Sequence, residues 1–166
     1  MKKFIISIDA GTTSNRTILF DLKGKPIFSS QKEFTQYFPK SGWVEHNPDE
    51  IWKTTIKTLK DVIQKAKRLK GKILSIGITN QRETTVLWDK KTGKPVYRAI
   101  VWQDRRTEEF CKKLRKQNKD TMVFNKTGLL IDSYFSGTKI KWILDNVPKA
   151  RQLMNKKQLL LSLIHI

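Results

Sequence analysis

The order of short apolar runs, tight turns and helical patterns is the feature that most constrains how this chain can fold. Three segments with strand patterns come first, at residues 4–8, 17–20 and 27–34, and the turn sequences AGTTSNR and DLKGKP separate them. Three consecutive strands joined by short turns predict an antiparallel meander. A helical pattern, a further strand and more helices follow along the chain. This order predicts an α/β fold with a mixed sheet and flanking helices.

The first helix is expected directly after Asn47. Asn47 is a favoured N-cap residue, and Pro48 suits the first helical position. Lysines fill the last turn, and Gly71 is expected to end the helix. Apolar residues recur at helical spacing between these ends, at Ile51, Trp52, Ile56, Leu59, Val62, Ile63 and Ala66.

The second half of the chain predicts further strands and two more helices. The expected elements are a strand from Ile73, a hairpin of strands at 86–88 and 96–102 around a turn at 89–95, a helix over about 104–116, and a helix from Ser136 or Gly137 to the residue before Pro148. Asp104 has the position of an N-cap for the earlier of these helices. Ile140, Ile143 and Leu144 are expected to face inward from the later one.

The net charge of the chain is strongly positive, with 34 Lys and Arg against 15 Asp and Glu and a formal charge of +19. Such a charge is found in nucleic-acid binders. Most of the basic residues are Lys, however, and they are scattered singly or in pairs. Lysine on solvated faces is therefore the favoured interpretation, and no nucleic-acid partner is expected.

Cysteine and histidine are too few to build a disulfide framework or a metal cluster. The single cysteine, Cys111, is expected to be a small buried or half-buried hydrophobe. Two histidines and one cysteine do not make a metal site. The apolar start ends in Asp9 after five residues, which is too short for a signal peptide, and no run approaches membrane-spanning length. The expected compartment is the cytoplasm, with no membrane partner.

Asp9 and the turn that follows it form the first candidate site. Gly11 permits backbone N–H groups to approach an anion closely. The turn also carries hydroxyl and guanidinium donors, at Thr12, Thr13, Ser14 and Arg16. Such a turn suits a phosphate, and Asp9 would suit a hydrated magnesium ion that accompanies it. A plain β-hairpin is the alternative, because Gly, Thr, Ser and Asn are common turn residues.

A row of seven polar residues, TNQRETT at 79–85, directly follows the apolar run at 73–78 and forms the second candidate site. Ligands of α/β folds lie at the ends of strands. Arg82 and Glu83 together offer a donor and an acceptor, which suits the hydroxyls of a neutral polyol. The alternative is a surface ion pair, which is common and contributes little to stability.

Two aromatic residues are further candidates. Trp102 ends a predicted strand and is either an apolar wall for the carbon backbone of a ligand or a core residue. Tyr134 lies in a loop before a helix and is either a hydroxyl donor or a packing residue.

Five motifs carry a family resemblance: DAGTTSNR, GWVEHNPDEIW, IGITNQRETTVLWDKKTGKP, AIVWQDRRT and TGLLIDSYFSGTKIKWILD. Together they resemble the N-terminal part of the FGGY carbohydrate kinase family, and in particular its glycerol-phosphorylating members. The resemblance covers residues 4–147. The row from Asn80 to Thr85 is its most specific part, since other sugar kinases of the family usually differ there.

The resemblance implies an actin-like, ribonuclease-H-like ATPase fold, of which this chain would be an incomplete first domain. It implies transfer of the γ-phosphoryl group of ATP to glycerol to give sn-glycerol 3-phosphate, with Mg²⁺ as a cofactor and a homo-oligomer as the full-length protein. Among the residues of this chain, it gives Thr12, Thr13, Ser14 and Arg16 to the ATP phosphates, Asp9 to magnesium, and Arg82, Glu83, Trp102 and Tyr134 to glycerol.

The sequence also departs from the family pattern. Ala10 stands where glutamine is usual, and Ser133 where proline is usual. Residues 1–150 are expected to form the family domain, and residues 151–166 an apolar tail without a partner at a truncated end. The catalytic base is expected beyond Ile166, so the fragment alone is expected to be inactive. A kinase for another polyol or sugar, and a basic ribonuclease-H-like nucleic-acid-binding module, are the alternatives.

Overall fold

The structure is a computed structural model that describes residues 1–162. The chain divides into two compact units. Of the described residues, the first contains residues 1–36 and 47–81, and the second contains residues 37–46 and 82–162. Among the described residues, no helix has both the length and the apolar composition of a membrane span.

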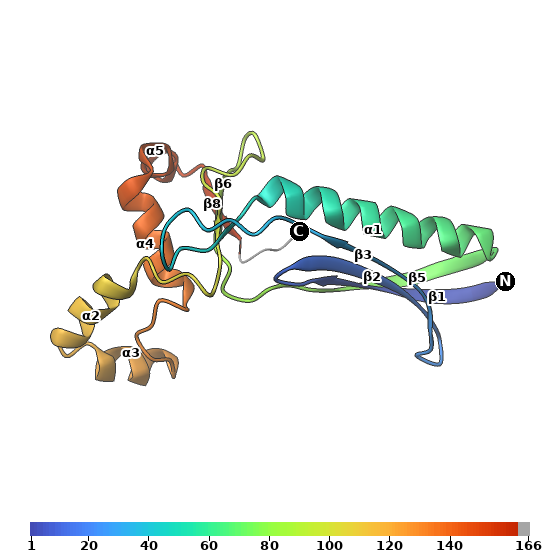
Figure 1. Ribbon diagram of the computed structural model, residues 1–166, viewed down its shortest axis with the longest axis horizontal. Helices are drawn as coiled ribbons and strands as arrows, with labels where there is room; N and C mark the ends of the chain where they lie inside the picture. The colour runs from blue at the N-terminus through green and yellow to red at the C-terminus, as the bar shows by residue number, and fades with distance from the viewer. Residues whose placement is uncertain (163–166) are drawn as a thin grey trace. The chain divides into compact units, whose positions relative to one another are not determined.

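A four-stranded sheet forms the body of the first unit (Figure 1). Its strands are β1 (Lys2–Ala10), β2 (Ser14–Asp21), β3 (Pro26–Glu33) and β5 (Gly71–Thr79), in the order β3-β2-β1-β5. β2 is antiparallel to both β1 and β3, whereas β5 is parallel to β1. The predicted meander and mixed sheet are therefore confirmed.

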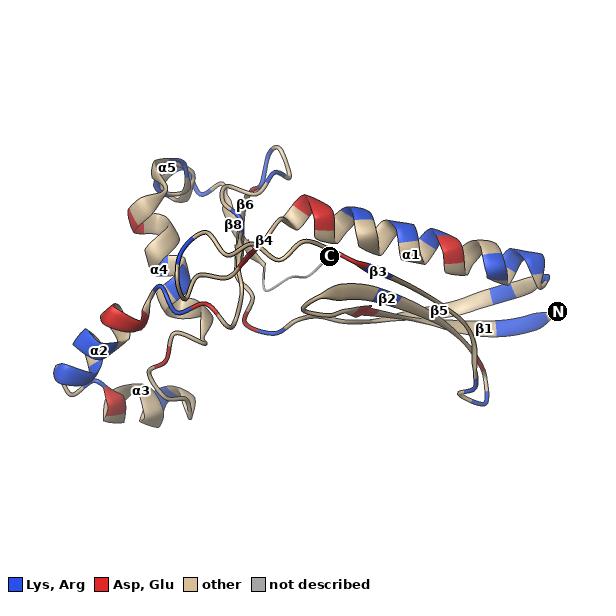
Figure 2. Cartoon of the chain, viewed as in Figure 1, with Lys and Arg blue, Asp and Glu red and all other residues tan. Residues whose placement is uncertain are grey.

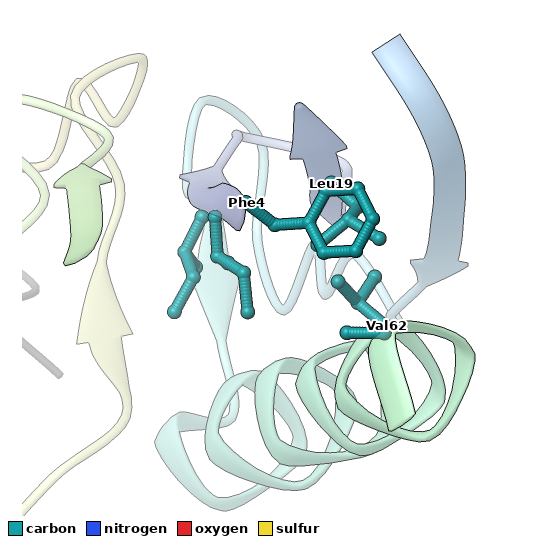
Figure 3. Close-up of a cluster of buried hydrophobic side chains, with 6 residues drawn as sticks. Phe4, Leu19 and Val62 are labelled. Atoms are coloured by element: carbon teal, nitrogen blue, oxygen red, sulfur yellow. The ribbon is translucent and has the colours of Figure 1, made fainter. Parts of the chain in front are cut away.

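Helix α1 (Pro48–Arg68) lies along one face of this sheet (Figure 1). It begins as predicted, because the side chain of Asn47 accepts a hydrogen bond from Asp49 N at 3.0 Å. Phe4 and Leu19 point from the strands toward Val62 of α1 (Figure 3). Ile6, Ile8 and Ala66 complete the buried cluster. Alternation along β1 thus places every second side chain against the helix.

The end of α1 differs from the prediction. The helix ends at Arg68 with Leu69 as its C-cap, and Lys70 adopts the left-handed conformation with a φ of 52°. Gly71 is the first residue of β5 instead. A Cβ atom at Gly71 would lie 2.1 Å from Cε2 of Phe4, so it is the aromatic ring that requires glycine here.

The second unit combines small sheets with short helices (Figure 1). β4 (Glu45–His46) is antiparallel to β7 (Ala99–Ile100), and β6 (Val86–Asp89) is antiparallel to β8 (Leu159–Ser162). The helices are α2 (Glu108–Lys116), α3 (Asp120–Thr127), α4 (Ser136–Asn146) and α5 (Pro148–Asn155). The buried cluster of this unit contains Leu87, Ile100, Ile143 and Ala150, packed by Ile140 and Leu144 among others. The prediction of α4 and of its inward face is confirmed.

The predicted hairpin is present in interrupted form. Asp89 N donates to Lys94 O at 2.9 Å, closing the turn as expected. Beyond its turn, Val96 N donates to Leu87 O at 2.9 Å, and Thr85 and Ile100 exchange two backbone hydrogen bonds. The returning strand expected at residues 96–102 is confined to β7, which pairs with β4 and not with β6. The antiparallel pairing is interrupted between Val96 and Ile100, where the hydroxyl of Tyr97 donates to Glu45 of β4 at 2.8 Å.

The end of the chain also differs from the expectation of a tail without a partner. β8 pairs with β6 over its full length, from Leu159 opposite Asp89 to Ser162 opposite Val86. The boundary expected at residue 150 lies inside α5. The remainder of the expected tail, residues 163–166, lies outside the described residues.

Candidate functional site

The turn between β1 and β2 is closed by its glycine. Gly11 N donates to Ser14 O at 3.0 Å, and a Cβ atom at Gly11 would lie only 2.9 Å from that oxygen. Directly after the turn, Asn15 Nδ2 donates to Ile51 O of α1 at 2.9 Å. The turn is therefore tight, and it is fixed to the helix that covers the sheet.

The carbonyl oxygens of this turn are engaged by the protein. Besides the bond within the turn, the donors are Gln81 Nε2 to Gly11 O at 3.1 Å, Gln36 Nε2 to Thr12 O at 3.2 Å and Phe34 N to Thr13 O at 3.3 Å. Carbonyl oxygens repel an anion, whereas backbone N–H groups of a tight turn attract one. Bonds that occupy the carbonyl groups therefore favour an anion at this turn.

Gln81 is a residue of this site that its sequence context does not indicate. It lies in the polar row, is buried, and belongs to the first unit. The parallel pairing of β5 with β1 brings the carboxyl ends of the two strands to one edge of the sheet, so Gln81 reaches the turn after β1. A sequence-based prediction that β1 and β5 are parallel neighbours would have indicated that Gln81 reaches this turn.

Asp9 and Arg16 face each other across the β1–β2 pair. Arg16 Nη2 donates to Asp9 Oδ2 at 3.2 Å, and both side chains are nearly half exposed. Ser14 Oγ accepts a hydrogen bond from Gln31 Nε2 at 2.8 Å. Among residues 1–162, no group of three or more His, Cys, Asp or Glu side chains could hold a metal ion.

Glu83 is the central residue of the second candidate site, which lies in the second unit. Its Oε2 accepts hydrogen bonds from Ser136 N at 3.0 Å and from Ser136 Oγ at 2.6 Å, at the N-terminus of α4. The positive end of the helix dipole favours a carboxylate there. Within the described part of the chain, Oε1 has no hydrogen-bond partner, so one oxygen of Glu83 caps the helix and the other is available.

Lys139 joins Glu83 to Tyr134. Its Nζ donates to Glu83 O at 2.9 Å and to Tyr134 O. The side chain is fully buried, and burial lowers its pKa to about 8. Neither Lys139 nor Ser136 stands out in the sequence, because serine and lysine are ordinary residues near the start of a helix.

Tyr134 in turn contacts Trp102. The ring centroids lie 5.8 Å apart at an interplanar angle of 62°, and both residues are half-buried. Glu83, Tyr134 and Trp102 thus belong to one cluster, as expected for three residues predicted to contact the same ligand. Arg82 is exposed, and it forms no ion pair with Glu83 and no hydrogen bond within residues 1–162. The alternative of a surface ion pair between Arg82 and Glu83 is therefore wrong.

The segment after Trp102 has a structural role. Asp104 is buried and accepts hydrogen bonds from Val44 N and Arg106 Nη2, at 2.7 and 2.8 Å. The guanidinium of Arg106 also binds Glu45 at 2.8 Å and lies 3.8 Å from the ring centroid of Trp43. The prediction of Asp104 as an N-cap is wrong, because this ion pair holds its carboxylate and α2 begins later, at Glu108.

Comparison with known proteins agrees with this architecture. Residues 4–165 match the N-terminal domain of the FGGY family of carbohydrate kinases. The chain is 58% identical over 163 residues to a glycerol kinase of Malacoplasma penetrans, and 60% identical over 151 residues to one of Oceanobacillus iheyensis. These matches cover 98% and 91% of this chain, but only 32% and 30% of the relatives. The chain therefore spans about a third of the length of the curated relatives it matches.

A solved structure shows the same fold. The crystal structure of Plasmodium falciparum glycerol kinase with ADP matches with a TM-score of 0.92 and 34% sequence identity, over 97% of this chain and 32% of that chain. This likeness confirms the expected actin-like, ribonuclease-H-like architecture.

Proposed function

We propose that this chain, which belongs to the FGGY family of carbohydrate kinases, is part of an ATP-dependent glycerol kinase that phosphorylates glycerol to sn-glycerol 3-phosphate. The observation that carries the proposal is the arrangement around Glu83, whose carboxylate is fixed at the start of α4 with one oxygen unengaged. The identity of the chain to proteins named glycerol kinase supports the same acceptor.

The polyol half of the reaction would belong to four side chains of the second unit. Glu83 Oε1 accepts a hydrogen bond from a hydroxyl of glycerol, and the exposed guanidinium of Arg82 donates one. Trp102 supplies an apolar surface for the carbon chain, and the Tyr134 hydroxyl adds a further donor. A fixed carboxylate beside an unpaired guanidinium matches hydroxyls that both give and take hydrogen bonds.

The nucleotide half would belong to the turn of the first unit. The hydroxyls of Thr12, Thr13 and Ser14 and the guanidinium of Arg16 bind the phosphates of ATP, and the occupied carbonyl groups of the turn reduce repulsion. In phosphoryl transfer, positioning and neutralisation of charge supply most of the catalysis. This turn therefore serves as a positioning element for the transferred group.

Asp9 fits a magnesium ion that accompanies ATP. One oxygen of its carboxylate pairs with Arg16, and the other has no hydrogen-bond partner within the described residues. Mg²⁺ keeps several waters and binds through one or two carboxylates together with substrate phosphates, so one half-exposed carboxylate is sufficient. When bound, the ion would neutralise charge on the phosphate oxygens.

Binding of glycerol to the purified chain tests the polyol assignment. Amide resonances around Glu83 and Tyr134 are followed by NMR as glycerol is added. We expect Glu83→Gln to weaken glycerol binding about tenfold, because a charge-assisted hydrogen bond is lost. The matched control is Glu109→Gln, which changes an exposed acid of the same unit.

Equal affinity in wild type and Glu83→Gln would overturn the assignment of Glu83. Tighter binding of a longer polyol than of glycerol would favour a kinase for another polyol or sugar within the same family.

A further inference from the structure

Lys139 lies in the first turn of α4, and its charged side chain is fully buried. Lysine is almost never fully buried unless it is paired. Within residues 1–162, Lys139 has no carboxylate at ion-pair distance. The next lysine of the helix shows the ordinary behaviour, because Lys141 is half-exposed and pairs with Asp145 at 2.6 Å. The burial of Lys139 therefore calls for a specific explanation.

Lys139 binds two backbone carbonyl groups instead of a carboxylate. Its Nζ donates to Glu83 O at 2.9 Å and to Tyr134 O. One of these carbonyl groups follows β5, and the other precedes α4. The ammonium group therefore ties together the two loops that carry the polyol residues.

Glu83 is held at both ends by the first turn of α4. Ser136 binds its carboxylate with the backbone N and with Oγ, and Lys139 binds its backbone oxygen. The φ of Glu83 is 63°, a left-handed conformation that is strained for a residue with a Cβ atom. The bonds from α4 maintain a backbone conformation that the residue would not favour alone.

We propose that Lys139 is a positioning residue that fixes Glu83 for a polyol ligand, and that it does so fully only as the ammonium cation. The identity of the ligand in this proposal rests on the polyol site proposed above. Hydrogen bonds from a charged donor are roughly twice as strong as those from a neutral one. Loss of the proton therefore loosens the loops of Glu83 and Tyr134 together.

The protonation of Lys139 changes within an accessible range of pH. Burial lowers its pKa from 10.5 to about 8, while the carboxylates of Glu83, Asp104 and Asp132 act in the opposite direction. The cation predominates below this pKa and the neutral amine above it. The polyol site is thus expected to lose order as the solution becomes alkaline.

The first measurement needs no ligand. The amide resonances of Glu83 and Ser136 are followed in the purified chain between about pH 6 and pH 10, a range that brackets the lowered pKa. We expect both amides to shift with a midpoint of about 8 in wild type and in the control Lys141→Met, and to show no such transition in Lys139→Met. A transition that persists in Lys139→Met, or that is absent from wild type, overturns the proposal.

Two features keep this measurement decisive. Cys111 interacts with Thr138, and its pKa is raised by burial. Because all three proteins contain Cys111, a shift that it causes would persist in Lys139→Met. If Lys139→Met does not fold, direct observation of the ¹⁵Nζ resonance of Lys139 in wild type decides the question, since its midpoint must coincide with that of the Glu83 amide.

The second measurement adds glycerol below and above the transition. We expect wild type to bind glycerol about tenfold more weakly on the alkaline side, because Glu83 is less well fixed, and Lys139→Met to bind weakly at both pH values. Equal binding by wild type on both sides overturns the link to the ligand. If glycerol binds at neither pH while the amides titrate, the polyol function fails, and the positioning of Glu83 by Lys139 stands on the first measurement.

Discussion

At the scale of single residues, the sequence pattern singles out Glu83 as a candidate site residue but gives no sign of Lys139. The polar row after an apolar run indicates Glu83 as a ligand residue, and the structure places it beside Tyr134. Lys139 has no such signal, because its burial depends partly on the loop of Glu83, which is distant in the sequence. No local pattern distinguishes it from Lys141, which is half-exposed on the same helix.

The buried charge of Lys139 predicts a pH-dependent stability. Because its pKa falls from 10.5 in the unfolded chain to about 8 in the folded one, the unfolded chain binds more protons between these values. The free energy of unfolding therefore rises with pH across this window. Relative to Lys139→Met, wild type should gain on the order of 3 kcal/mol as the pH rises through it.

Urea unfolding at a series of pH values measures this difference. Lys141→Met should follow wild type throughout, because Lys141 is half-exposed. A constant difference between wild type and Lys139→Met would show that the ammonium group is not desolvated in the folded chain.

At the scale of helices and strands, local signals were sufficient where the element carries its own pattern. α1 could be predicted because its cap, its apolar stripe and its basic last turn lie in one segment. β8 could not be recognised as a strand with a partner, because its ladder is with β6, far earlier in the chain. α3 has no buried residue and exposes Met122 and Phe124, so the apolar periodicity that reveals a helix is absent.

Two glycines of β5 predict contrasting effects of the same substitution. A Cβ atom at Gly71 would overlap the ring of Phe4, whereas a Cβ atom at Gly77 would have no heavy atom within 4 Å. We expect Gly71→Ala to lower the free energy of unfolding by about 1–3 kcal/mol through overpacking. Gly77→Ala should change it by less than about 0.5 kcal/mol.

Denaturant unfolding of both variants checks this contrast. Phe4→Leu should recover part of the loss in Gly71→Ala, because it removes the ring that the new methyl group meets. Equal stability of the two alanine variants would mean that the Phe4 ring does not set the requirement for glycine.

At the scale of the whole chain, the two candidate sites belong to different compact units. The turn between β1 and β2 lies in the first unit and the cluster of Glu83, Tyr134 and Trp102 in the second, and the division falls between Gln81 and Arg82. Gln81 donates to the turn after β1, and Glu83 two residues later belongs to the second candidate site. The polar row therefore contributes to both sites, which its sequence alone could not reveal.

The positive charge is distributed along the helices and strand ends, and acidic residues interrupt it on α1 and α2 (Figure 2). Lys57 pairs with Asp61 and Lys112 with Glu109, both at 2.7 Å. Solvated lysine faces remain our interpretation of the charge.

We predict that the purified 166-residue chain does not phosphorylate glycerol. Phosphoryl transfer requires both substrates to be aligned in a site that excludes water, and the chain spans about a third of its relatives. Formation of glycerol 3-phosphate from ATP and glycerol is measured with the Malacoplasma penetrans glycerol kinase as the positive control. Turnover above background that Asp9→Ala abolishes would show that these residues suffice.

If Glu83 binds the acceptor as proposed, its second role as the cap of α4 restricts how the acceptor preference of such a protein can evolve. A substitution at Glu83 that accommodates a different acceptor also removes the cap of α4, so it requires a new cap to arise with it. Arg82 has no comparable second role among the described residues, since it is exposed and makes no hydrogen bond or ion pair there. Adaptation to a new acceptor, by selection or by design, is therefore expected to begin at Arg82 and to change Glu83 late.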